Sequence, residues 1–201
     1  MSATTARLEA FSDGVLAIAI TLLVLEIRVP NVPKGSTLAH ELLHLWPKYA
    51  VFTVSFVTIG IMWINHHVLF QGVEGVDRGL LFLNLLLLLS ISFVPFPTAV
   101  LGDYVRAGNS GRAAAVLYGA NMLLVGIGFL ALWWYLRAHP ELRSTDLSDD
   151  AVRQAIRRTI IGPALYATSI VVALFSAPVA LVLFAALAGY FATGYVPAFR
   201  K

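Results

Sequence analysis

Charged and amide side chains interrupt the apolar segments of this chain, and they are the residues whose types could do chemistry. The first apolar segment carries Glu9 and Asp13 and ends at Glu26, and later segments carry histidines and an asparagine. In hydrocarbon such groups are costly unless they pair or face water, so each is a functional candidate. The candidate polar residues are Arg7, Ser12, Asp13, Trp63, His66, His67 and Asn84.

These residues allow two interpretations. A structural network is the simpler one, because hydrogen bonds between helices tie membrane bundles together. Proton sensing by His66 or His67 is the alternative, since imidazole titrates near neutral pH. In both cases Arg7 needs an acidic partner, which could be Asp13 or a carboxylate of a neighbouring element.

A second pattern suggests an enzyme. His40, Glu41 and His44 match H-E-x-x-H, which on a helix places two histidines on one face for zinc, with the glutamate as base. The motif lies in a short connection between apolar segments, Pro47 follows it, and no clear third ligand is nearby. An amphipathic turn at the membrane interface is the favoured interpretation, and we expect no enzymatic activity and no metal site.

Composition indicates that lipid surrounds much of the chain. Of its 201 residues, 59% are hydrophobic and 12% are charged, whereas soluble domains carry about 25% charged residues. The absence of cysteine excludes disulfides and thiolate zinc sites. The net charge of +3 comes from scattered basic residues, so nucleic acid is not an expected partner. We expect an all-α membrane protein with a single domain, residues 1–201, and no cofactor.

Six segments could cross the bilayer, for which a helix needs about 20 largely apolar residues. The apolar block at residues 159–196 would reach about 57 Å as one helix, so we divide it near Pro178, because proline is favoured in a first helical turn. Of the 14 lysines and arginines, nine then lie on one side and five on the other, which favours cytoplasmic termini in a multi-pass protein. The expected spans are 5–29, 48–71, 79–101, 111–137, 156–175 and 178–197.

The first of these segments differs from the others. Its uninterrupted apolar run, from Gly14 to Leu25, reaches only about 18 Å as a helix, which is too short for a hydrocarbon core about 30 Å thick. Carboxylates flank the run at both ends. Such a helix could be a packing element, or it could be a pore wall with negative mouths and an apolar constriction that gates by dewetting. The residues that share one helical stripe on this run are Ile18, Thr21, Leu22 and Leu25.

The same segment resembles the first-helix signature of the transmembrane protein 175 family, which are potassium-permeable channels of bacteria, archaea and animal lysosomes. The signature is an arginine four residues before Phe-Ser-Asp, and Arg7 with Phe11, Ser12 and Asp13 fits it. The chain length and the six expected spans also look like the bacterial form, which carries one six-helix repeat per chain. The residues at positions where the family's supporting polar groups are expected are Trp63, His66, His67 and Asn84.

The resemblance implies a homotetramer in the cell membrane, with the first helix of each subunit around a central pore. It assigns the hydrophobic constriction to Ile18, a polar layer to Thr21 and the next constricting position to Leu25. Leu22 either lines the pore or packs behind it. The Phe-Ser-Asp motif is expected to be buried and structural, and to hold the pore helix to the second and third helices.

The expected function is a potassium-permeable cation channel with a moderate preference for potassium over sodium. Other monovalent cations and protons are further candidate permeants. The chain lacks a Thr-Val-Gly-Tyr-Gly sequence, so a carbonyl-lined filter is not expected. The alternative is a secondary transporter of ions or small solutes, although transporters usually contain internal repeats and the two halves of this chain share no obvious pattern.

Overall fold

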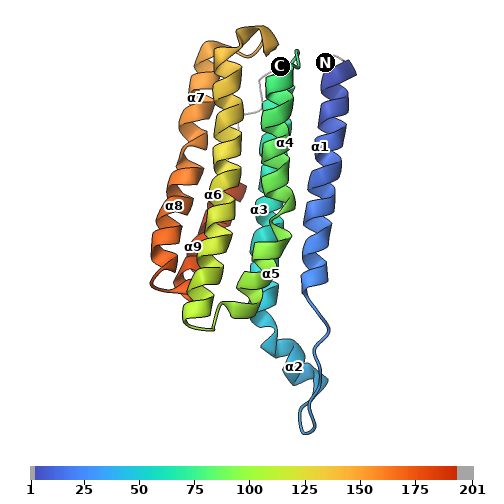
Figure 1. Ribbon diagram of the computed structural model, residues 1–201, viewed down its shortest axis with the longest axis vertical. Coiled ribbons are helices and arrows are strands. Elements are labelled where there is room, and N and C mark those ends of the chain that lie inside the picture. Colours follow the sequence, from blue (N-terminus) through green and yellow to red (C-terminus); the bar gives the residue numbers. More distant parts are fainter. Residues whose placement is uncertain (1–2, 194–201) are drawn as a thin grey trace.

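The structure is a computed structural model that describes residues 3–193 of the chain. Every named element in that range is a helix, which confirms the all-α class. The long helices stand side by side, and α2 lies beyond one end of the bundle (Figure 1). The elements are α1 (Ala3–Leu22), a 3-10 turn (Leu23–Glu26), α2 (Leu38–His44), α3 (Trp46–Gln71), α4 (Arg78–Ser92), α5 (Pro95–Tyr104), α6 (Asn109–Ala138), a second 3-10 turn (Pro140–Leu142), α7 (Asp149–Thr159), α8 (Ile161–Ala173) and α9 (Ala177–Thr193).

Among residues 3–193, four helical stretches are long and apolar enough to cross a membrane. The helices α8 and α9, which correspond to the last two expected spans, are shorter. Part of the expected span 178–197 cannot be compared, because residues 194–197 lie outside the described residues. The four long stretches are Thr5–Glu26, Trp46–Gln71, Arg78–Tyr104 and Asn109–Ala138.

Local sequence explains where the first two long helices end and begin. Helical geometry in the first stretch stops at Glu26, three residues before the predicted end at residue 29. Val29 precedes Pro30, and the residue before a proline is disfavoured in helical conformation. The stretch α3 begins with Pro47 in its first turn, where the missing N–H of proline would have no helical partner anyway.

Prolines also divide two of the predicted spans. The third span is split into α4 and α5 around Val94, because Pro95 cannot donate a helical hydrogen bond. The fifth span is split into α7 and α8 at Ile160. There the ring of Pro163 conflicts with the carbonyl of the residue four positions earlier, Thr159.

The helix α6 forms the centre of the packing between α4 and α8. Two glycines on α6 allow α8 to come close: a Cβ built on Gly119 would lie 2.8 Å from Ile170, and one on Gly126 would lie 2.8 Å from Pro163. Small residues commonly allow such close approach between membrane helices. The contact between α6 and α8 is therefore close at these two glycines, and this part of the bundle, on the side away from α1 (Figure 1), is called the scaffold.

At the end of the bundle where α1 begins, the loop after α3 is held to the connection after α6 (Figure 1). The backbone N–H of Glu74 donates to the carbonyl of Leu142 at 3.0 Å. Asp77 caps α4, since its carboxylate accepts from the N–H of Leu80 at 2.8 Å, and it also accepts from the Tyr135 hydroxyl of α6 at 2.6 Å. These hydrogen bonds lower the pKa of the Asp77 carboxyl.

We predict that Asp77→Ala lowers the unfolding temperature of the purified protein by several degrees, because it removes the helix cap and the link to α6. Tyr135→Phe removes only the second bond and should have a smaller effect. The stabilisation by Asp77 should be complete above the usual aspartate pKa of about 3.9, and it should be lost as the pH falls through the lower pKa of the folded state. Thermal unfolding at neutral and acidic pH measures this, and equal unfolding temperatures for all three proteins at neutral pH would contradict the role.

Candidate functional site

The helix α1 has two different faces. On one face Leu16, Ala19 and Leu23 are 1%, 0% and 0% exposed, and they pack against α3 and its neighbours. Ser12 lies on the same buried face. The other face remains uncovered in the single chain, because α1 stands at the edge of the bundle (Figure 1).

The uncovered face carries the stripe that the sequence singled out. Ile18 is 61% exposed, Leu25 is 68% exposed and Leu22 is 41% exposed, and Thr21 is exposed between them. Ile18, Thr21 and Leu22 lie three and four positions apart and so share one side of α1. Leu25 follows on the 3-10 turn Leu23–Glu26 and continues the exposed strip. The strip is apolar apart from one hydroxyl.

The hydroxyl of Thr21 has its hydrogen directed back into the helix. It donates to the carbonyls of Ala17 and Ile18, each at 2.9 Å. A hydroxyl has one hydrogen and two lone pairs, and these carbonyls engage the single hydrogen of Thr21. The Thr21 oxygen therefore keeps acceptor capacity without a free donor, which suits a cation rather than an anion.

A chain of hydrogen bonds fixes the opposite face of α1 to α3 and α4. His66 donates from Nε2 to the Asn84 Oδ1 at 2.9 Å, and Asn84 donates from Nδ2 to the Ser12 Oγ at 3.0 Å. Ser12 in turn donates to the backbone carbonyl of Leu8 at 2.9 Å. The side chains of Ser12, His66 and Asn84 are buried, so the structure brings these three predicted residues together in one network.

A second contact joins α1 to α3 at the same level. The indole Nε1 of Trp63 donates to the Asp13 carboxylate at 3.0 Å. The ring of Trp63 stacks on the ring of His67, with 6.3 Å between centroids, and Gln71 donates to His67 at 2.9 Å. Asp13, Trp63 and His67 are exposed in the single chain, so these three contacts lie at the rim of the buried network.

The other two residues of the signature lie on the uncovered side. Phe11 is 53% exposed, and Arg7 is exposed as well. None of the three ion pairs formed within residues 3–193 involves Arg7 or Asp13. Within one subunit, therefore, Ser12 is the buried member of the Phe-Ser-Asp motif.

The H-E-x-x-H motif lies on the short helix α2, beyond the end of the bundle (Figure 1). The rings of His40 and His44 are 4.8 Å apart between centroids. The carboxylate of Glu41 accepts a hydrogen bond from the Ser36 hydroxyl. Residues 3–193 contain no group of three or more His, Cys, Asp or Glu side chains that could hold a metal ion.

Sequence reasoning missed a buried hydroxyl cluster in the scaffold. The Ser55 hydroxyl donates to the Tyr118 hydroxyl at 3.1 Å and lies 2.9 Å from the Thr98 hydroxyl. All three side chains are buried. Polar residues inside apolar segments usually face a partner within the bundle, so these residues could have been predicted from the sequence to form contacts between helices.

The comparisons with known proteins agree on one family. Residues 7–95 match the family model described as endosomal/lysosomal potassium channel TMEM175. A protein of Streptomyces collinus named potassium channel is 44% identical over 191 residues, which cover 95% of this chain and 93% of that protein. The endosomal/lysosomal proton channel TMEM175 of Gallus gallus is 33% identical over 135 residues, 63% of this chain and 27% of that protein.

A solved structure is also similar. The crystal structure of a lysosomal potassium-selective channel TMEM175 homolog from Chamaesiphon minutus aligns with a TM-score of 0.86 and 38% identity. The alignment covers 95% of this chain and 97% of that chain. The likeness therefore extends over nearly the whole helical arrangement, including α1 and the helices that hold it.

We predict that Asn84→Leu destabilises the protein, because it leaves the Ser12 and His66 side chains without their shared partner in the core. Leaving buried polar groups without a hydrogen-bond partner should lower the free energy of unfolding by about 1–3 kcal/mol. Ser90→Ala is the matched control on α4, since the Ser90 hydroxyl donates only to a carbonyl of its own helix. Denaturant unfolding of the solubilised protein measures both, and equal stability of the two variants would argue against the network.

Proposed function

Because the chain belongs to the TMEM175 family, we propose that α1 of each subunit lines a potassium-permeable pore at the centre of a homotetramer. The chain is a potassium channel, as its bacterial relatives are named, and it is a channel rather than a transporter. The family is one of ion channels, so the H-E-x-x-H motif is not read as a catalytic site.

The observation that carries the pore assignment is the exposure of Ile18 on a helix whose other face is fixed. An apolar strip on an edge helix could face either lipid or a partner copy. The run is too short to match the hydrocarbon core, and carboxylates flank it at both ends. A central position, where its ends meet water and its middle meets other copies of itself, removes that mismatch.

Four copies of Ile18 around one axis would form a ring of branched apolar side chains. Such a ring excludes water when it is narrow, so it can act as a gate by dewetting. Leu25 would form a second ring beyond it, and Leu22 would lie at the side of the strip. The constriction would set the barrier for every ion that passes.

Selectivity would come from how much of its hydration shell an ion must lose at this constriction. Potassium holds its water less tightly than sodium does, so a narrow apolar passage favours potassium. The Thr21 oxygen would replace part of the lost water. With hydroxyls in place of a full set of carbonyls, the preference should be moderate, and protons and other monovalent cations remain candidate permeants.

The same arrangement gives the remaining signature residues a structural role. Ser12, His66 and Asn84 would set the rotation of α1, and Asp13 with Trp63 would hold its start. Arg7 and Phe11, which are uncovered in one subunit, would be covered by the neighbouring subunit. In this proposal residues 156–175, which comprise the end of α7 together with α8, form the fifth span, the sixth span contains α9, and the termini lie in the cytoplasm.

We predict that Ile18→Asn increases potassium flux severalfold in reconstituted liposomes and reduces the preference for potassium over sodium, because the ring becomes wettable. Ile127→Asn is the matched control, since Ile127 is 47% exposed on α6, away from α1. It should leave flux and preference unchanged. If Ile18→Asn behaved like the control while both proteins remained tetramers, Ile18 would not be the constriction.

We also predict that Asp13→Ala lowers the yield of tetramer before it alters ion preference. The substitution removes the acceptor of the Trp63 indole N–H, so it should loosen the start of α1. Size-exclusion chromatography and the same liposome assay measure the two properties. A normal tetramer yield together with a changed potassium preference would assign Asp13 to the pore instead.

A further inference from the structure

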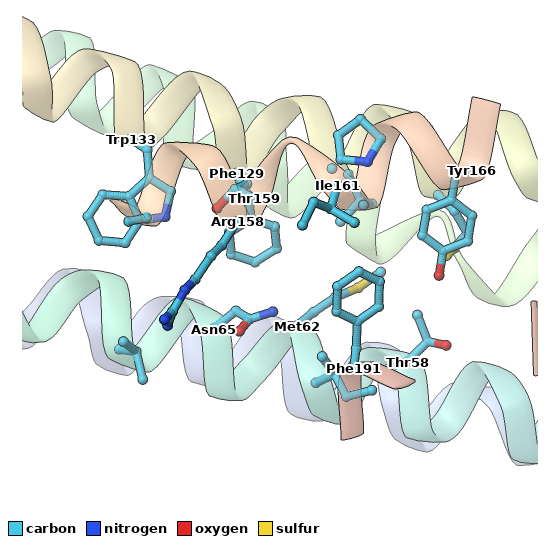
Figure 2. Close-up of a pocket in the computed structure, with 18 of the residues that line it drawn as sticks. Thr58, Met62, Asn65, Phe129, Trp133, Arg158, Thr159, Ile161, Tyr166 and Phe191 are labelled. Atoms are coloured by element: carbon cyan, nitrogen blue, oxygen red, sulfur yellow. The ribbon is translucent and has the colours of Figure 1, made fainter. Parts of the chain in front are cut away.

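A cavity of about 620 Å³ lies between α3, α6, α7–α8 and α9, on the side of the bundle away from α1. Its volume is within the ~300–1,000 Å³ range that is typical of small-molecule sites. Most of its lining is apolar and includes Met62, Phe129, Trp133, Ile161 and Phe191 (Figure 2). Two of the enclosing helices, α3 and α6, are long and apolar enough to cross a membrane, so lipids are the molecules with ready access to such a space.

One end of this cavity is polar. Arg158 reaches from α7 across the space toward Asn65 on α3 (Figure 2), and Gln154 is also among the lining residues. Both Arg158 and Gln154 remain exposed to the surroundings of the bundle. The three ion pairs formed within residues 3–193 do not include Arg158. A guanidinium without an acidic partner, placed beside apolar helices, favours an anion that can accept its fork of N–H donors.

Arg158 faces a part of α3 that is close to the end of that helix. Asn65 lies six residues before the end of α3 at Gln71, which is about 9 Å along the helix. The helix α7 is amphipathic, with Val152 and Ile156 buried and basic residues in its last turn. Basic amphipathic helices lie at the surface of anionic membranes.

Two other arginines near Arg158 already have acidic partners. Arg143 pairs with Asp149, and Arg153 pairs with Asp150. The Arg143 guanidinium donates to the Asp149 carboxylate at 2.7 Å, so this arginine already has an acidic partner. Arg158 is the arginine of α7 that lines the cavity.

We propose that this cavity binds one anionic phospholipid, with an acyl chain between Phe129 and Met62 and with the phosphate group on Arg158. The site is separate from α1 and from the pore assigned to it. Both parts of the lipid are needed for binding, because the apolar lining binds the acyl chain and Arg158 selects the negative charge of the phosphate.

The test uses the full-length, delipidated protein in a neutral detergent. Phosphatidylglycerol is titrated and the unfolding temperature is recorded, with phosphatidylcholine and soluble glycerol phosphate as comparison ligands. Phosphatidylglycerol should raise the unfolding temperature in a saturable way, and the other two should not. Equal stabilisation by phosphatidylcholine would overturn the selection of charge, and equal stabilisation by glycerol phosphate would overturn the need for an acyl chain.

Two variants and a control locate the site. Arg158→Gln should raise the half-saturating phosphatidylglycerol concentration by about tenfold, the loss expected for one charge-assisted contact. Arg157→Gln removes an equal charge at the preceding residue, which is outside the lining of this cavity. It should change the half-saturating phosphatidylglycerol concentration less than twofold. Ala155→Phe fills the cavity from α7 and should abolish the stabilisation.

Potassium flux in phosphatidylcholine vesicles serves as the check that each variant is folded, since none of these residues lies in the proposed pore. Equal effects of Arg157→Gln and Arg158→Gln would show general surface attraction and overturn the site. Undiminished phosphatidylglycerol binding by a flux-competent Ala155→Phe protein would overturn the position of the acyl chain.

Discussion

The rotation of α1 about its own axis depends on one chain of buried hydrogen bonds, from His66 through Asn84 to Ser12. Polar groups in a membrane bundle are costly without partners, so this chain favours one orientation of the helix. A helix turns 100° per residue, and Ile18 therefore lies about 120° around from Ser12. Fixing Ser12 inward is what leaves Ile18 on the uncovered face.

The two sides of the bundle are packed differently. On the side of α6 and α8, close packing at Gly119 and Gly126 makes a rigid scaffold. On the side of α1, the buried face is also packed, but the opposite face is exposed and has no covering neighbour among residues 3–193. Association of several copies through that face would cover it without disturbing the scaffold, which explains how one fold could combine a stable core with a conducting surface.

Much of this arrangement could be predicted from the sequence, because its signals were local. The low charge and long apolar segments indicated an all-α membrane protein, and the spacing of Ile18 and Leu25 placed them on one helical face. Pairings between distant elements could not be predicted in the same way. The hydrogen bond from Tyr135 to Asp77 and the hydroxyl cluster around Ser55 depend on which helices become neighbours, and a single sequence without tertiary information does not specify that.

The division between the two sides also separates two kinds of ligand. Ions would contact α1, whose strip offers apolar side chains and the single hydroxyl of Thr21, so they would be held weakly and pass on. The cavity beside Arg158 offers a charge and an apolar lining, so a lipid there would be held by both its phosphate and its acyl chain. Because α3 and α6 both line the cavity, a lipid at that site would act first on the packing between these two helices. An effect on ion preference would require α3, the helix that touches both regions, to shift as a unit.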